Sequence, residues 1–75
     1  MTQILSPAPR LDSAESLVER CDRCGVAAKL RVDLSGGGTL AFCGHHANQH
    51  AVEISRLARQ IVVEDGFRWR GRAAR

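Results

Sequence analysis

Two short cysteine-containing motifs constrain this chain more than any other feature of its sequence. The first is a C-x-x-C-G turn made by Cys21, Cys24 and Gly25, and the second is the C-x-x-H pair Cys43 and His46. Two residues between thiolates let both sulfurs reach one ion, and a glycine lets the chain turn beneath them. The two pairs supply the four ligands that tetrahedral Zn²⁺ prefers. We therefore predict one structural zinc ion held by Cys21, Cys24, Cys43 and His46.

A chain of 75 residues needs such a staple, because a small chain buries a low fraction of its surface. Aromatic side chains are scarce, with one Trp and two Phe, so the core must come from Leu, Val, Ile and Ala. Three cysteines are an odd number, which argues against a disulfide framework. A redox C-x-x-C motif would need a thioredoxin-like βαβ context, and the sequence does not show one.

The choice of histidine is open, because His45, His46 and His50 all follow the second motif. If a helix begins near Cys43, residues three apart share a face, so Cys43 and His46 converge. A rival ligand set keeps the first cysteine pair and His46 but replaces Cys43 by His50. The spacing favours Cys43 with His46, since His50 would lie about 10 Å along the helix axis from Cys43. His45 and His50 are then solvated side chains or donors that orient a ligand.

The rest of the chain predicts a hairpin followed by a helix. Apolar and charged residues alternate over residues 28–34, which indicates a half-buried strand. A turn at 35–38 with three glycines separates this strand from a second one at 39–43. Apolar residues then recur at intervals of three and four over residues 44–63, which predicts an amphipathic helix. A short helical turn is expected at 13–20.

This order of elements predicts a small zinc-stabilised α+β domain over residues 13–66. A knuckle, a β-hairpin and a C-terminal amphipathic helix whose first turn carries the second ligand pair resemble a treble-clef zinc finger. Pro7 and Pro9 indicate that residues 1–12 are a flexible leader. Residues 67–75 form a basic aromatic tail.

Charge is unevenly distributed along the chain. Residues 1–65 carry seven Lys or Arg and eight Asp or Glu, a balance of −1, whereas residues 66–75 carry four Arg and no acid. A charge argument for nucleic-acid binding therefore applies to the tail alone. The tail aromatics either contact a partner or fold back onto the core. The residues expected to contact a partner lie on the polar helix face and in the tail: Arg56, Arg59, Gln60, Phe67, Arg68, Trp69, Arg70 and Arg72.

The string CDRCG…AxxRV…GGxLxFCGHH, over residues 20–50, resembles a family of small actinobacterial and actinobacteriophage proteins that carry CDRCG and FCGHH. The resemblance implies zinc binding and an actinobacterial or phage source. It implies no catalytic activity. The partner that it implies is the transcription apparatus.

These observations favour a non-enzymatic, zinc-stapled interaction module over an enzyme. A site of three Cys and one His is closed, with no position for a catalytic water, so we assign no catalytic residue. We predict a regulator that binds a protein of the bacterial transcription machinery, either RNA polymerase or a sigma factor. The alternative is a nucleic-acid-binding zinc finger that uses the Arg-rich tail.

Other partners and locations are less compatible with the sequence. No apolar run approaches the roughly 18 residues of a membrane span, and no secretory hydrophobic region follows Met1. We therefore expect no membrane partner and a cytoplasmic location. We also expect no small-molecule substrate, because the site is closed.

Overall fold

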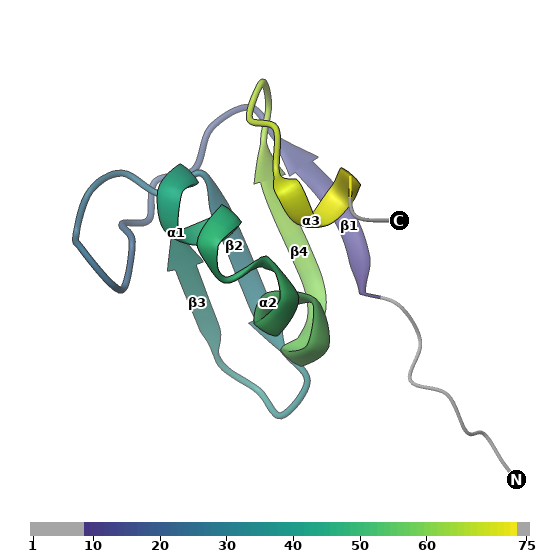
Figure 1. Cartoon of the computed structure of the whole chain (residues 1–75). Coiled ribbons are helices and arrows are strands. Elements are labelled where there is room, and N and C mark those ends of the chain that lie inside the picture. Colours follow the sequence, from purple (N-terminus) through teal and green to yellow (C-terminus); the bar gives the residue numbers. More distant parts are fainter. Residues whose placement is uncertain (1–8, 74–75) are drawn as a thin grey trace, which may run out of the picture.

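The computed structural model describes residues 9–73, with side chains for residues 9–71, and forms a four-stranded sheet with three short helices on one face (Figure 1). The strand order is β1-β4-β2-β3, in which β4 pairs parallel with β1 and antiparallel with β2. The elements follow one another along the chain as β1 (Arg10–Ala14), β2 (Leu30–Leu34), β3 (Thr39–Phe42), α1 (Gly44–Gln49), α2 (Ala51–Leu57), β4 (Ala58–Glu64) and α3 (Arg70–Ala73).

The predicted hairpin is present as β2 and β3. Leu30 lies opposite Phe42 and Val32 opposite Leu40, so the apolar side chains of the two strands share the face that packs against the helices. Leu30 and Val32 are fully buried, as the alternation of the sequence requires. The connecting turn places Gly37 at φ 102°, a conformation that costs glycine little.

The predicted helix over residues 44–63 is wrong beyond Leu57. The helical stretch is divided at His50 into α1 and α2, and the chain then continues as β4. Three consecutive β-branched residues, Ile61, Val62 and Val63, are all buried in β4. β4 has a neighbouring strand on each side, so its alternating side chains lie among those of β1 and β2, whereas an amphipathic surface helix exposes one side. The periodicity that continued through Ala58 and Ile61 therefore did not indicate a helix.

The N-terminal part of the domain is a strand rather than a helical turn. β1 pairs parallel with β4, from Arg10 opposite Gln60 to Ala14 opposite Glu64. Residues 10–12 of the predicted leader therefore belong to the sheet, and the helical turn predicted at 13–20 is not formed. The edge of β4 that does not pair with β2 supplies the backbone hydrogen-bond partners for β1. This pairing joins residues about 50 positions apart, so the local sequence pattern does not predict it. Residues 1–8 of the predicted leader lie outside the described residues.

The core lies between the sheet and the helices. Its most buried side chains come from the two central strands β2 and β4: Leu30, Val32, Ile61 and Val63. Ala47 of α1 and Ile54 of α2 cover them, and Trp69, just before α3, completes the cluster. Within residues 9–73, no helix has the length and apolar character needed to cross a membrane.

Candidate metal centre

The first cysteine pair lies in a tight turn that the backbone itself holds. The amide of Cys21 donates to the carbonyl of Val26 at 2.7 Å, and the amide of Gly25 donates to the carbonyl of Cys21 at 2.8 Å. Gly25 has a φ of 83°, in the left-handed region where a side chain would be strained. The glycine of the C-x-x-C-G motif therefore has the role that the sequence indicated.

Asp22 fastens this turn to the edge of the sheet. Its amide donates to the carbonyl of Ala41 at 2.9 Å, and its carboxylate accepts from the amide of Ala41 at 2.7 Å. Both backbone groups of Ala41 are satisfied by one residue of the turn, so the turn is held beside the end of β3. Sequence reasoning did not assign a role to Asp22, although the residue lies inside the first motif.

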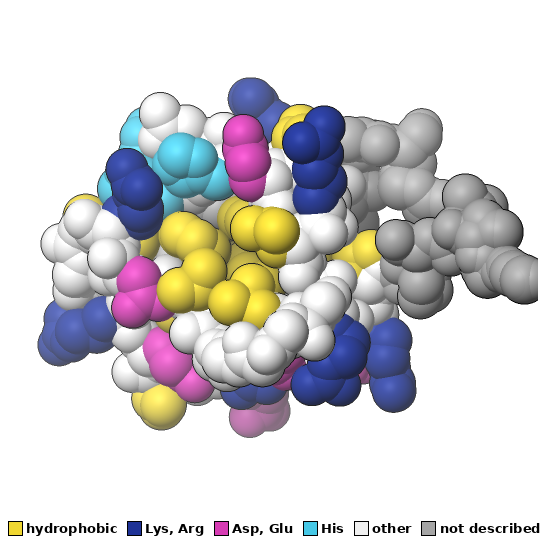
Figure 2. Space-filling view, turned by 90° about the horizontal axis from the view of Figure 1, so that it is seen from below, with side chains coloured by type: hydrophobic (Ala, Val, Ile, Leu, Met, Phe, Trp, Pro, Cys, Tyr) yellow, Lys and Arg dark blue, Asp and Glu magenta, His cyan; other side chains and the backbone are white. Residues whose placement is uncertain are grey.

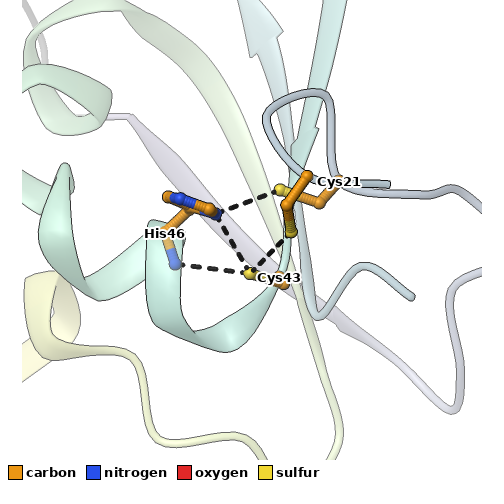
Figure 3. A group of neighbouring side chains, drawn as sticks. Cys21, Cys43 and His46 are labelled. Carbon is orange, nitrogen blue, oxygen red and sulfur yellow. Dashed lines mark hydrogen bonds between the residues drawn. The ribbon is translucent and has the colours of Figure 1, made fainter. Parts of the chain in front are cut away.

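The second ligand pair lies at the junction of β3 and α1. Cys43 is the N-cap of α1, and its sulfur accepts a hydrogen bond from the amide of His46 at 3.4 Å. The cap orients the first turn of the helix, so that the Cys43 sulfur and the His46 ring point to the same side (Figure 3). Cys21, which belongs to the C-x-x-C-G turn, lies next to them (Figure 3).

The structure brings all four predicted ligands together. The Nδ1 atom of His46 lies 3.3 Å from the Cys43 sulfur and 3.5 Å from the Cys21 sulfur. The sulfurs of Cys24 and Cys43 are 3.8 Å apart, and one donor atom from each of the four residues lies within 4.8 Å of the others. Cys21 and Cys43 are buried and Cys24 is exposed, so the group lies at the surface end of the core. These four residues could hold a metal ion.

The electrostatics of the cluster favour a cation. Burial raises the pKa of the Cys21 thiol, but hydrogen bonds from backbone amides, that of Cys43 foremost, lower the pKa to about 6. A backbone hydrogen bond from Val26 lowers the pKa of Cys24, but desolvation and the neighbouring thiols Cys21 and Cys43 outweigh it and raise the pKa. The cluster thus resists carrying several thiolates without a compensating charge. A bound cation removes that resistance, because metal ligation requires deprotonated thiols.

The other two histidines are not part of the ligand group. His45 is exposed, and its ring meets the edge of the His46 ring at a centroid distance of 5.0 Å. The His50 ring stacks on His46 at 6.1 Å with an interplanar angle of 13°. The rival set that replaces Cys43 by His50 is therefore not the one assembled. His50 packs against a candidate ligand instead of being one.

The three partner-contacting residues predicted on one helix face do not lie on one helix. Arg56 is exposed on α2, but Arg59 and Gln60 lie in β4, so the expectation that all three share a helix face is wrong. The cause is the end of the helix at Leu57. The side-chain amide of Gln60 donates to the carboxylate of Asp12 in β1.

The tail folds back onto the domain. Trp69 is only 3% exposed, and its indole N–H donates to the carbonyl of Ala47 at 2.8 Å. Phe67 packs over Gly44, where a Cβ atom would approach the Phe67 ring to 3.1 Å. Trp69 is thus a core residue, and its burial rules out the partner contact that we predicted for it. The small core contains few other aromatic side chains and therefore has room for the indole.

The arginines of the tail lie differently from its aromatics. Arg68 and Arg70 are exposed, whereas the side chain of Arg72 lies outside the described residues. The backbone amide of Arg70 donates to the side-chain carbonyl of Asn48 at 2.5 Å. Asn48, which sequence reasoning overlooked, therefore helps to fix the start of α3.

Comparison with known families places most of the chain in a described family. A family described as a domain of unknown function (DUF7455) matches residues 15–68. The matched segment contains the four clustered Cys and His residues, the hairpin, α1, α2 and β4. The comparisons with curated proteins and with solved structures found no match.

Proposed function

The chain belongs to the DUF7455 family, and we propose that it is a non-enzymatic interaction module stapled by zinc. In a tetrahedral zinc site, Zn–S bonds of about 2.3 Å and Zn–N bonds of about 2.0 Å place sulfurs about 3.8 Å apart and sulfur and nitrogen about 3.5 Å apart. The Cys24–Cys43 separation of 3.8 Å and the separations of 3.3 and 3.5 Å from His46 Nδ1 fit those edges. Three thiolates and one imidazole are also the donor set that zinc prefers over harder cations.

The proposed staple has the connectivity of a treble clef. One ion would join the turn at Cys21 and Cys24, before the hairpin, to Cys43 and His46, at the start of α1. The hairpin lies between these two ligand pairs, as it does in a treble clef. We propose this relation from the order and contacts of these elements alone.

An apolar hollow between α2 and the hairpin is the observation that carries the interaction role. Figure 2 shows hydrophobic side chains gathered in this hollow, with histidine on one side and charged side chains around it. The volume is about 160 Å³, and Arg23, His50 and Glu53 stand at the rim. The apolar lining comes from both strands and from α2: Val32, Leu34, Leu40, Phe42, Ile54 and Leu57.

Exposure of this lining to water favours a protein partner. Leu57 is 57% exposed at the edge of the hollow, and Leu34 and Leu40 are half-buried. An apolar hollow rimmed by polar groups is typical of protein–protein contact sites. The ligand cluster adds support for a role other than catalysis, since its four donors would fill a tetrahedral ion completely.

The proposed partner is a protein of the bacterial transcription machinery, either RNA polymerase or a sigma factor. This choice follows from the resemblance of the CDRCG and FCGHH motifs to small actinobacterial and phage proteins, and it places the chain in the cytoplasm of such a host. Nucleic-acid binding through the tail has less support. Trp69, the side chain best suited to stack on a base, is buried.

Capture experiments test the proposal. Tagged protein is incubated with nuclease-treated actinobacterial lysate, and the captured proteins are identified by mass spectrometry. We expect a polymerase subunit or a sigma factor, and we expect Leu57→Asp to abolish its capture because the charge lies at the apolar hollow. Val18→Asp is the matched control, since Val18 is 91% exposed and lies outside the hollow.

Two results would contradict the proposal. One is recovery of nucleic acid from untreated lysate with no polymerase subunit or sigma factor. The other is equal capture by the wild-type protein and by Leu57→Asp. Native mass spectrometry and circular dichroism are used to test whether each variant retains metal and secondary structure, so that a loss of capture can be assigned to the surface.

A further inference from the structure

A second hollow lies between α2 and α3, and the charged residues that line it within the described side chains (residues 9–71) are Arg56 and Arg70. Its volume is about 330 Å³, and it is lined by Ala51, Val52, Ser55, Arg56, Arg70 and Gly71, which we call the arginine groove. Val52 is 66% exposed, so part of the apolar surface beside the two arginines faces water. The groove thus combines a small apolar surface with two positive charges.

Neither arginine of the groove is neutralised by the described part of the chain. The ion pairs there involve Lys29 and Arg31, and no hydrogen bond within residues 9–71 uses the guanidinium of Arg56 or Arg70. Both side chains are exposed, and each retains the full set of five donors. Such a pair attracts a negatively charged group from outside the domain.

The two arginines of the groove come from different helices. Arg56 comes from α2, and Arg70 begins α3, which lies beside α2 (Figure 1). The buried Trp69 and the hydrogen bond from the amide of Arg70 to Asn48 attach α3 to α1. The backbone positions of the two charges are therefore set before any partner arrives, which reduces the ordering cost of binding.

We propose that the arginine groove binds an acidic segment of a protein partner, with carboxylates on Arg56 and Arg70 and a small apolar side chain on Ala51 and Val52. The inference rests on the proposed interaction function and names the chemistry of the partner. Guanidinium groups form paired, charge-assisted hydrogen bonds with carboxylates, and arginine is enriched at binding hot spots. The apolar surface between the charges matches a peptide better than a phosphate backbone.

The groove is poorly suited to nucleic acid. Among the residues whose side chains the structure describes, the groove lining has no aromatic ring on which a base could stack. Residues 1–65 have a net charge balance of −1, so the sequence gives the body of the domain no excess of positive charge for phosphate contacts. An acidic peptide needs only the two charges and the apolar contact that the groove provides.

The test uses zinc-loaded full-length protein and defined probes. The first probe is a fluorescein-labelled octapeptide with a central Leu flanked by Glu residues, and the second is the same peptide with Gln in place of Glu. We expect the Glu peptide to shift the amide NMR signals of residues 51–56 and 70–71, and the Gln peptide to leave them unchanged. We expect Arg56→Gln/Arg70→Gln to raise the anisotropy Kd by about tenfold or more. Arg10→Gln, an exposed change on β1, is the matched control and should leave the Kd unchanged.

Several outcomes would overturn the inference. They are the absence of groove shifts, equal losses in the double variant and the Arg10→Gln control, and tighter, steeply salt-dependent binding of a single-stranded oligonucleotide to the groove. The capture assay separates this inference from the proposed function. If Leu57→Asp abolishes capture of a transcription protein but the arginine variant does not, the module function stands and the groove proposal fails. Failure to capture any transcription protein while the Glu peptide still binds the groove contradicts the named partner and supports the groove.

Discussion

The ring of His46 makes contacts through one of its nitrogen atoms and through one of its faces. Its Nδ1 faces the sulfurs of Cys21 and Cys43, while one face of the ring stacks on His50. When Nδ1 is a ligand, the proton of the neutral ring resides on Nε2, so the ring behaves as a single tautomer. His50 thus contributes to the orientation of His46 through packing.

This geometry gives the first prediction, on ligand identity. If zinc is the ion, as proposed, His46→Ala should bind none, because it removes one of four donors, whereas His50→Ala should bind one zinc ion per chain. Native mass spectrometry at neutral pH measures both stoichiometries. His45→Ala is the control, since its ring is exposed and lies outside the ligand group. Zinc lost from His50→Ala and kept by His46→Ala would contradict the assignment.

Gly71 is required by the packing of Trp69. A Cβ atom at position 71 would lie 2.4 Å from the Trp69 indole, far inside contact distance, and the buried ring has little room to move. We predict that Gly71→Ala destabilises the domain by about 1–3 kcal/mol, the usual cost of overpacking. Chemical denaturation measures the loss, and a red shift of Trp69 fluorescence, the only tryptophan signal, locates it.

Gly36→Ala is the matched control for this prediction. A Cβ atom there meets nothing within 4 Å, and its φ is not in the left-handed region. It should leave both the stability and the Trp69 emission nearly unchanged. Equal effects of the two substitutions would show that the packing around Gly71 is not what the fold requires.

The carboxylate of Glu64, at the end of β4, links this strand to two other segments of the chain. Glu64 accepts from Lys29 at 2.6 Å, just before β2, and from the backbone amide of Leu17 at 3.1 Å, in the segment after β1. The hydrogen bond from Lys29, followed by that from Leu17, lowers the pKa of Glu64 below its ordinary value of 4.5. A lowered pKa means that this contribution to stability is complete above pH 4.5 and is lost as the pH falls through the folded-state pKa.

The third prediction follows from the lowered pKa of Glu64. Glu64→Gln should lower stability at pH 7 and make stability less dependent on pH below 4.5, because Gln cannot gain a proton. Urea denaturation from pH 7 to pH 3 gives both effects. Glu15→Gln, an exposed acid, should retain the wild-type pH profile. An unchanged acid limb in Glu64→Gln would show that other carboxylates determine it.

The whole molecule depends on a small core closed at one end by the ligand cluster. The sheet buries one face under the three helices, and the hydrogen bonds between Asp22 and Ala41 hold the first cysteine pair at the edge of β3. Without a cation, the three cysteines of the cluster repel one another if they are ionised, and they lose hydration if they stay protonated. Metal binding and folding should therefore be coupled.

Chelation gives the prediction at this scale. Zinc binding contributes an apparent 10–16 kcal/mol in small zinc fingers, comparable with the whole stability of about 5–15 kcal/mol of a typical domain. Removal of zinc by 1,10-phenanthroline should therefore unfold the chain, with loss of amide NMR dispersion and exposure of Trp69. Re-addition of zinc should restore both signals. A dispersed spectrum from metal-free protein would contradict the coupling.

Much of the candidate site could be predicted from the sequence alone, because its determinants are local. The spacing of Cys21 and Cys24 sets a turn, and three residues from Cys43 to His46 span one helical turn. The hairpin followed from alternation and from its glycines for the same reason. Only the contact between the two ligand pairs depends on the tertiary fold, and the metal-ligand spacing of each pair already implied that contact.

The tertiary structure alone decided the states of residues 10–14, 58–64 and 67–71. The spacing of apolar residues in 58–64 also fits a helix. These residues form β4 because β1 and β2 offer backbone partners on both sides. The tail is basic and aromatic in sequence, but Trp69 enters the core because α1 offers the carbonyl of Ala47 and an unfilled apolar surface. Local sequence encodes side-chain period and ligand spacing. Strand pairing and burial depend on groups dozens of residues away, which a local pattern does not specify.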